Sequence, residues 1–137
     1  MISSYNSATQ DVLTDGLLAF STNRILTGCT VTHNENSTTF RLNKPGYYYV
    51  SFNGTAATAE TAGVITVELQ NNGVSVPGAE ASSYSAAATN IVNLAFSTIV
   101  KVPPGCGCVD NSVALTFLNA GVEANYENVN VNITKLC

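Results

Sequence analysis

The residues of this chain that could take part in the most kinds of chemistry are its four cysteines, Cys29, Cys106, Cys108 and Cys137. Four thiols allow three intrachain pairings, and they could also stay as free buried thiols, bind zinc with His33 as a substitute ligand, or form a redox-active pair. The Cys-Gly-Cys spacing differs from the Cys-x-x-Cys of common zinc knuckles, and no thioredoxin-like βαβ pattern surrounds it. A bridge between Cys106 and Cys108 would strain so short a ring, so we expect any disulfide to join one of them to Cys137 or Cys29.

Hydrolytic catalysis needs a nucleophile, a base and an orienting group, and His33 is the only histidine available as a base. No Gly-x-Ser-x-Gly nucleophile elbow accompanies it, and no glycine-rich loop lies at a strand-to-helix junction where it could hold a phosphate. The carboxylate pairs Asp11/Asp15 and Glu123/Glu127 could cleave sugars, but they are more simply read as solvated turn residues. We therefore predict a non-enzyme with no catalytic residue, no cofactor and no metal site.

The polar surface of this chain depends on uncharged side chains. Of the 137 residues only 10% are charged, whereas Asn, Ser and Thr together number 44. The net charge of −4 argues against a nucleic-acid partner and against a polybasic contact with anionic lipid. No apolar run approaches the roughly 18 residues that span a bilayer, so we predict no membrane insertion. The first ten residues lack the basic and apolar segments of a signal peptide, so we expect a domain of a longer chain or export by another route.

The sequence has no long stretch with the period of a helix. It has short runs in which apolar and polar residues alternate, separated by turn residues, and these runs predict about nine or ten strands. The clearest run follows the turn Lys44-Pro45-Gly46, where Tyr48, Val50 and Phe52 face one side of a strand and Tyr47, Tyr49 and Ser51 face the other. One further run is expected over residues 12–20, interrupted at Asp15-Gly16, and a brief one over 74–76 that stops at Pro77-Gly78. The other expected runs cover residues 29–33, 38–42, 64–69, 91–100, 113–117, 124–126 and 129–133. Asn71-Asn72-Gly73 predicts a tight hairpin. The pattern predicts an all-β sandwich of Greek-key or jelly-roll type.

The alternation also selects the residues that should build the core of this sandwich. They are Phe40, Tyr48, Val50, Phe52, Leu115, Phe117, Val131 and Ile133.

The segment from Phe40 to Phe52, FRLNKPGYYYVSF, resembles the signature of the complement component 1q and tumour necrosis factor-like globular head. In that family a Phe precedes a Pro-Gly turn, and Gly-x-Tyr-x-Phe-x-Phe/Tyr follows. Gly46, Tyr48 and Phe52 match this pattern, whereas Val50 replaces an aromatic residue. Residues 69–73 are similar to the family's Leu-x-x-Asn-Gly hairpin, and residues 90–105 to its long strand and following turn. Cys106 stands where the family has an acid, and the cysteine pattern is closer to heads of bacterial and bacteriophage proteins on collagen-like or fibre stalks.

The resemblance implies a ten-strand jelly roll that packs as a homotrimer, with residues 1–11 as a lead-in or stalk junction and residues 12–137 as the head. If Tyr48 faces the core, Tyr47 and Tyr49 must face outward. Such a tyrosine pair is a candidate trimer interface, because tyrosine buries a large area while its hydroxyl stays hydrated. The alternative is that loops of the same chain cover this face.

In the family's topology the last strand ends in the same half of the sandwich as the turn before Cys106. We therefore expect a disulfide from Cys106 or Cys108 to Cys137 rather than to Cys29, and exposure at an extracellular or virion surface.

Two roles are compatible with these expectations. The head would trimerise and drive assembly of a surface or fibre protein, and its loops, such as residues 79–89 and 123–127, would bind a cell-surface glycan or protein receptor. The alternatives are a phage tail-fibre tip that binds a glycan or receptor, and a cytokine-like receptor ligand. The expected location is extracellular, at a cell or spore surface, or on a virion.

Overall fold

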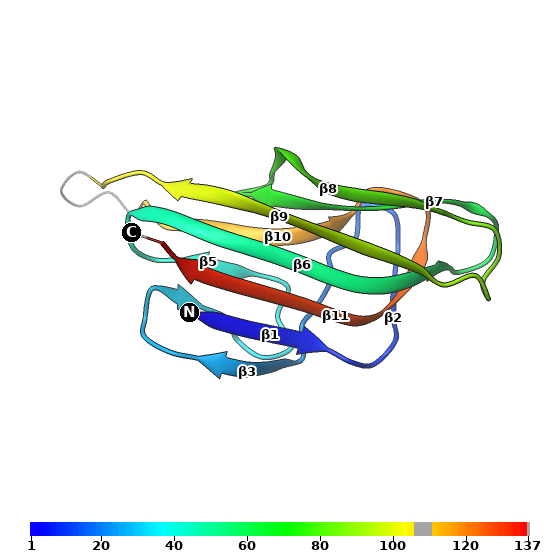
Figure 1. The fold of residues 1–137 in the computed structure, drawn as a ribbon, viewed down its shortest axis with the longest axis horizontal. Coiled ribbons are helices and arrows are strands. Elements are labelled where there is room, and N and C mark those ends of the chain that lie inside the picture. The colour runs from blue at the N-terminus through cyan, green and yellow to red at the C-terminus, as the bar shows by residue number, and fades with distance from the viewer. Residues whose placement is uncertain (106–110, 137) are drawn as a thin grey trace.

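The computed structural model describes residues 1–105 and 111–136, and this part of the chain folds into two antiparallel sheets packed face to face (Figure 1). Eleven strands and no helix occur within the described residues, which confirms the predicted all-β jelly-roll sandwich. None of the described segments is a helix that could cross a membrane.

The first sheet has the strand order β3-β1-β11-β6-β9, with β2 paired to β11. Its strands are β1 (Ile2–Asn6), β2 (Gln10–Val12), β3 (Thr22–Leu26), β6 (Gly46–Thr58), β9 (Val92–Val102) and β11 (Ala124–Lys135). The second sheet has the order β4-β5-β10-β7-β8. Its strands are β4 (Val31–Thr32), β5 (Phe40–Leu42), β7 (Gly63–Asn71), β8 (Val74–Ser85) and β10 (Val113–Asn119). Below they are called the six-stranded and the five-stranded sheet.

The core between the sheets is organised around Phe117 of β10. Its ring centroid lies 5.3 Å from that of Phe52, 5.7 Å from Phe20 and 6.1 Å from both Phe40 and Phe96. Aromatic pairs at these separations stabilise a core beyond the area they bury. All eight residues selected for the core by sequence, from Phe40 to Ile133, are at most 2% exposed.

Two hydroxyl-bearing tyrosines extend the aromatic core. The Tyr48 hydroxyl donates to the Lys44 carbonyl oxygen at 2.6 Å, and the Tyr126 hydroxyl donates to Asn119 Oδ1 at 2.8 Å. Both phenols are fully buried, so each needs such a partner to avoid the cost of an unsatisfied polar atom. The sequence pattern places Tyr48 inward but does not show where its hydroxyl bonds.

The hairpin between β7 and β8 forms where Asn71-Asn72-Gly73 predicts it. Asn72 has φ 50° and Gly73 has φ 83°, the left-handed conformations that a two-residue hairpin turn requires. Asn72 Oδ1 also accepts a hydrogen bond of 2.8 Å from the Ala114 amide, which ties the turn to β10.

The N-terminal residues differ from the expected lead-in. Residues 2–6 form β1, which lies between β3 and β11 and pairs with both, and Ile2 is fully buried. The sequence signal for this strand is weak because its other buried inward position is Ser4, whose hydroxyl bonds the Thr22 carbonyl oxygen at 3.0 Å. The packed sheet therefore begins about ten residues before the boundary inferred from sequence.

Three further segments depart from the predicted strands. The run over 12–20 is not one strand: β2 ends at Val12, and Asp15 adopts φ 65°. The brief strand over 74–76 continues through Pro77-Gly78 to Ser85, because a bulge with Gly78 at φ 81° absorbs the break. Residues 124–127 likewise belong to β11, whose register shifts at a bulge containing Asn128 with φ 53°. Residues 79–85 are thus strand, not the loop expected there, and the short strand expected over 124–126 forms as the first part of β11 rather than as part of a binding loop over 123–127.

Candidate functional site

The outer face of the six-stranded sheet carries the tyrosine pair that the sequence analysis selected. On β6, Tyr48 is buried, whereas Tyr47 is 45% and Tyr49 is 40% exposed. No segment of the described chain covers them to the extent that the alternative interpretation required. The Leu136 amide donates to the Tyr47 carbonyl oxygen at 2.7 Å, and Lys101 Nζ lies 5.9 Å from the Tyr47 ring centroid. The backbone and the ring of Tyr47 are thus both held by neighbouring segments.

This face has almost no charge across four adjacent strands. Three charged residues lie at its margins: Lys101 toward one end, Glu127 toward the other, and Arg24 of the edge strand β3, whose guanidinium lies 5.0 Å from the ring centroid of Tyr5. Between them the outward positions are occupied by uncharged residues: Ser3 and Tyr5 on β1, Asn130, Asn132 and Thr134 on β11, Tyr47, Tyr49, Ser51, Asn53 and Thr55 on β6, and Asn93, Ala95, Ser97 and Ile99 on β9. Depletion of charged residues characterises the core of protein–protein interfaces.

Apolar side chains add to this face beside the tyrosines. Ile99, directly opposite Tyr49 on β9, is 57% exposed. On the other side of Tyr49 a depression of about 280 Å³ extends to Ile25 of β3. It is lined by Met1, Ile2, Ser3, Ile25, Tyr49, Asn132, Ile133 and Thr134. The sequence could indicate Ile99, because it is out of phase with the buried residues of its run. It could not indicate Met1 and Ile25, because neither β1 nor β3 is evident in the pattern.

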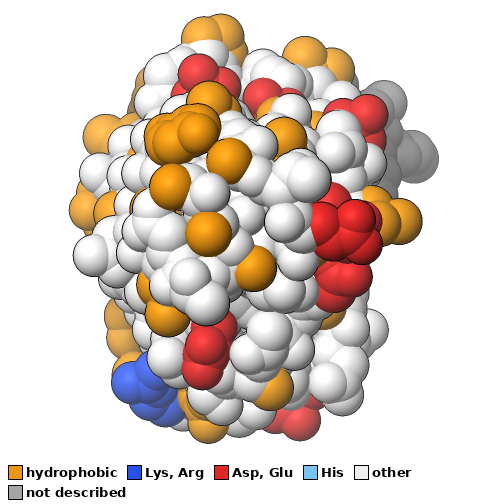
Figure 2. Space-filling view, turned by 90° about the vertical axis from the view of Figure 1, so that its right-hand side faces the viewer, with side chains coloured by type: hydrophobic (Ala, Val, Ile, Leu, Met, Phe, Trp, Pro, Cys, Tyr) orange, Lys and Arg blue, Asp and Glu red, His pale blue; other side chains and the backbone are white. Residues whose placement is uncertain are grey.

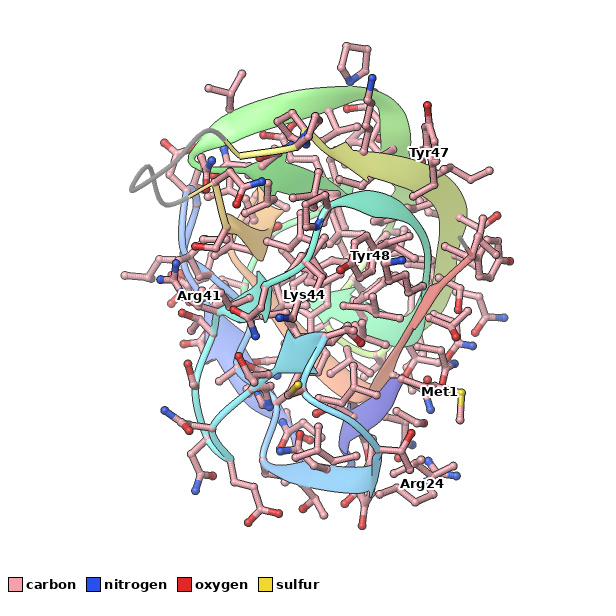
Figure 3. All side chains as sticks on the ribbon, turned by 90° about the vertical axis from the view of Figure 1, so that its left-hand side faces the viewer. Met1, Arg24, Arg41, Lys44, Tyr47 and Tyr48 are labelled. Atoms are coloured by element: carbon pink, nitrogen blue, oxygen red, sulfur yellow. The ribbon has the colours of Figure 1, made fainter. Side chains whose placement is uncertain are left out.

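The outer face of the five-stranded sheet is different. Arg41 projects outward from β5, and Glu68 and Glu80 are register partners on β7 and β8. Figure 3, which views the left-hand end of Figure 1, shows Arg41 on one side of the molecule and Tyr47 and Met1 on the other. The two sheet faces thus have distinct chemistry, one charged and one nearly uncharged.

His33 is a structural histidine. It is 6% exposed, and its ring stacks on Phe40 with a centroid distance of 4.2 Å. Nδ1 lies 2.7 Å from Asn23 Oδ1, and Nε2 lies 2.9 Å from the Ser37 carbonyl oxygen. Burial lowers the pKa of His33, and the Ser37 carbonyl and the Glu35 carboxylate only partly offset this effect. Neither ring nitrogen contacts a nucleophilic side chain, so the arrangement is not that of a hydrolytic triad.

Of the four cysteines only Cys29 falls within the described residues. It is exposed, lies in the turn between β3 and β4, and has a free thiol in this structure. Cys106, Cys108 and Cys137 lie outside the described residues, and a disulfide to Cys137 stays a prediction.

Acidic residues gather at the end of the sandwich where β6 connects to β7 and β8 to β9, as the red side chains in Figure 2 show. Desolvation raises the pKa of Glu123, as do the hydrogen bond and charge of Asp11 and the charge of Glu60. Within residues 1–105 and 111–136 no group of three or more His, Cys, Asp or Glu side chains could hold a metal ion.

The sequence matches no protein-family model, and no curated protein matches it. Solved structures nevertheless share its fold. The globular domain of zebrafish complement 1qA superposes with a TM-score of 0.70 at 10% identity, covering 99% of this chain and 96% of that one. The PRD1 vertex protein P5 gives 0.60 at 14% identity, over 99% and 96% of the two chains. Murine APRIL gives 0.58 at 7% identity, over 98% of each. The chain therefore has the fold of the complement 1q and tumour necrosis factor-like heads.

Proposed function

We propose that this chain is a non-enzymatic head domain that self-associates into a homotrimer through the outer face of its six-stranded sheet. The observation that carries this proposal is the nearly uncharged face between Lys101 and Glu127, with Tyr47, Tyr49 and Ile99 exposed on it. Exposed aromatic and aliphatic side chains on a charge-poor surface favour burial against another protein. The number three rests on the resemblance to the complement 1q head, which implies a trimer.

A threefold assembly needs the contact between copies to close into a ring. The depression between Tyr49 and Ile25 gives the face a concave part, and Ile99 gives it a projecting apolar side chain. The depression and the projecting side chain lie on opposite sides of Tyr49 on one sheet, so one copy could receive a neighbour's apolar side chain while offering its own to the next.

The role proposed for this trimer is assembly of a larger surface or fibre protein. The start of β1 and the end of β11 both lie toward the left in Figure 1, so a stalk attached there would leave the opposite end free. The PRD1 vertex protein P5, which has the same fold, is by its name a vertex protein, which supports a location on a virion. Receptor or glycan binding at the free end, as in a cytokine-like ligand or a tail-fibre tip, is the alternative role.

Light scattering across micromolar concentrations tests the assembly. The expected mass is three times the 14.3 kDa of the chain. Tyr49→Glu should give a monomer, because it places a charge in the centre of the apolar part of the face. Tyr84→Glu is the matched control, since Tyr84 is 61% exposed on β8 of the other sheet and its replacement should leave the trimer intact. A wild-type chain that stays monomeric at all concentrations contradicts the proposal, and so does equal dissociation of the two variants.

A further inference from the structure

A polar cavity of about 170 Å³ opens on the five-stranded sheet, away from the proposed interface. It lies between β4, β5 and the loop of residues 33–39 that joins them. Thr32, His33, Asn34, Ser37, Thr39 and Arg41 line it, so every side chain of its wall can form hydrogen bonds. Such a wall suits a ligand that is itself covered with hydroxyl or carboxyl groups and offers little to an apolar one.

Arg41 supplies the only charge in this lining. It projects outward from β5 between Thr32 of β4 and Ala114 of β10. Its Nη1 donates to Ser112 Oγ at 3.0 Å, and no carboxylate of the described residues pairs with it. A guanidinium has five N–H donors arranged to fit a carboxylate through two parallel hydrogen bonds. Most of the Arg41 donors thus remain for a ligand.

The uncharged side chains around Arg41 also keep hydrogen-bonding capacity. Thr32 Oγ1 accepts from Asn43 Nδ2 at 3.2 Å, which leaves its own hydrogen free to donate. In the described part of the chain the Thr39 hydroxyl and the Asn34 side-chain amide form no hydrogen bond. Hydroxyl and amide side chains both donate and accept hydrogen bonds. Neighbouring hydroxyls of a sugar also donate and accept, so they need partners of this kind.

The loop that forms the cavity is held in place by the rest of the fold. The Asn36 amide donates to the Phe20 carbonyl oxygen at 2.9 Å, and the Phe20 amide donates to the Ser37 carbonyl oxygen at 3.2 Å. The stack of His33 on Phe40 fixes the wall beneath it. A site whose side chains are already ordered loses less entropy when a ligand binds.

The charge balance around the cavity limits the charge of its ligand. Glu35 belongs to the same loop, where its carboxylate accepts from the Asn23 amide at 3.3 Å rather than pairing with Arg41. A single guanidinium with no second cation in the lining suits a monoanion and disfavours a phosphate dianion.

We propose that this cavity binds a carboxylate-bearing sugar unit, with Arg41 on the carboxylate and Thr32, Asn34 and Thr39 on the sugar hydroxyls. The site lies on the sheet opposite to the trimer interface and does not depend on self-association.

Glucuronate, glucose and acetate are the probes that separate the parts of this proposal. Glucuronate and glucose differ only at the C6 carboxylate, and acetate carries the carboxylate without the sugar. Titration of the 15N-labelled protein should show glucuronate shifting the amide signals of residues 32–41, with at least a roughly tenfold higher affinity than glucose or acetate, the usual effect of a hydrogen bond to a charged group. Equal binding of glucose, equal binding of acetate, or no binding of glucuronate would each overturn the proposal.

Variants assign the contacts. Arg41→Gln should weaken glucuronate binding roughly tenfold or more, and Thr39→Val should weaken it without changing the preference over glucose. Arg24→Gln is the matched control, because Arg24 of β3 lies over the Tyr5 ring at 5.0 Å, on the outer face of the six-stranded sheet and outside the cavity lining. Unchanged affinity in Arg41→Gln contradicts the assignment. Light scattering on the same samples reports self-association separately, so a failure of one proposal cannot be mistaken for a failure of the other.

Discussion

The hydroxyl of Tyr126 and the side-chain oxygen of Asn119 form a hydrogen bond of 2.8 Å in which both residues are completely buried. The side-chain nitrogen Nδ2 of Asn119 donates to the carbonyl oxygens of Val122, Val12 and Leu13 at 2.9, 3.0 and 3.3 Å. A single side chain thereby joins the irregular segment after β2 to the turn between β10 and β11. Burial also raises the pKa of Tyr126, so its hydroxyl stays protonated and keeps donating.

We predict that Asn119→Ala lowers the free energy of unfolding by about 3 kcal/mol or more, because it leaves several buried polar atoms without partners. Tyr126→Phe removes only the bond to Asn119 and should cost about 1–2 kcal/mol. Urea denaturation followed by far-ultraviolet circular dichroism measures both values. Equal losses in the two variants would show that the carbonyl contacts of Asn119 contribute little.

A second prediction concerns the direction of the side chains on β6. Phe52 is 2% exposed, and its ring stacks on Phe96 at 5.4 Å and on Phe117 at 5.3 Å. Phe52→Ala should therefore destabilise the fold by roughly 3–5 kcal/mol, the usual cost of truncating a buried aromatic side chain. Ser51→Ala, one residue away on the outer face, should change stability by less than about 0.5 kcal/mol. Denaturation curves at one protein concentration compare the two, and the reverse order would mean that the facing of the strand is wrong.

Strong alternation explains which parts of the fold the sequence could predict. In residues 47–52 and 113–117 every second residue is a large apolar one that is buried, and the residues between them point outward. In these two strands the direction of each side chain and the membership of the core follow directly from the sequence. The hairpin at Asn72-Gly73 is equally clear, because few residues other than Asn and Gly adopt its backbone conformation.

The remaining elements are fixed by long-range contacts that local patterns do not contain. β1 has Ser4 at an inward position and is defined by its neighbours β3 and β11. Asn119 reads as an ordinary turn residue in the sequence, and only the fold brings Val12 and Leu13 to its side chain. For the same reason the sequence selects Tyr47 and Tyr49 for the proposed interface but not Met1 and Ile25, which β1 and β3 place beside Tyr49.

His33 makes stability sensitive to pH in a predictable direction. Burial lowers its pKa in the folded state relative to the ordinary value of 6.5. The folded state thus binds a proton less readily than the unfolded state, and stability is complete above pH 6.5 and declines as the pH falls through the lowered folded pKa. Because His33 is the only histidine, the part of the change between about pH 7 and about pH 5.5 that His33→Gln removes reports on this residue.

Thermal unfolding at half-unit pH steps over that range measures the effect. The melting temperature of the wild-type chain should decrease on acidification, whereas His33→Gln, which cannot titrate, should give a flat profile. A melting temperature that increases on acidification would mean that the Ser37 and Glu35 contacts outweigh burial.

The last prediction concerns Gly121, in the turn between β10 and β11. A Cβ atom at this position would clash with the Val64 carbonyl oxygen and would lie only 2.6 Å from the Thr66 nitrogen. The turn cannot easily move away, because the Ala120 amide donates to the Thr66 carbonyl oxygen at 2.8 Å and the Val122 amide donates to that of Val64 at 3.1 Å. Gly121→Ala should therefore lower the free energy of unfolding by more than about 3 kcal/mol, at the upper end of overpacking effects. Gly28→Ala is the control: Gly28 has φ 74° but no atom within 4 Å of the position that an added Cβ would take, so only the backbone strain of about 1–2 kcal/mol applies. Urea midpoints measured side by side decide the matter, and similar losses in the two variants would show that the β10–β11 turn can separate from β7 at little cost.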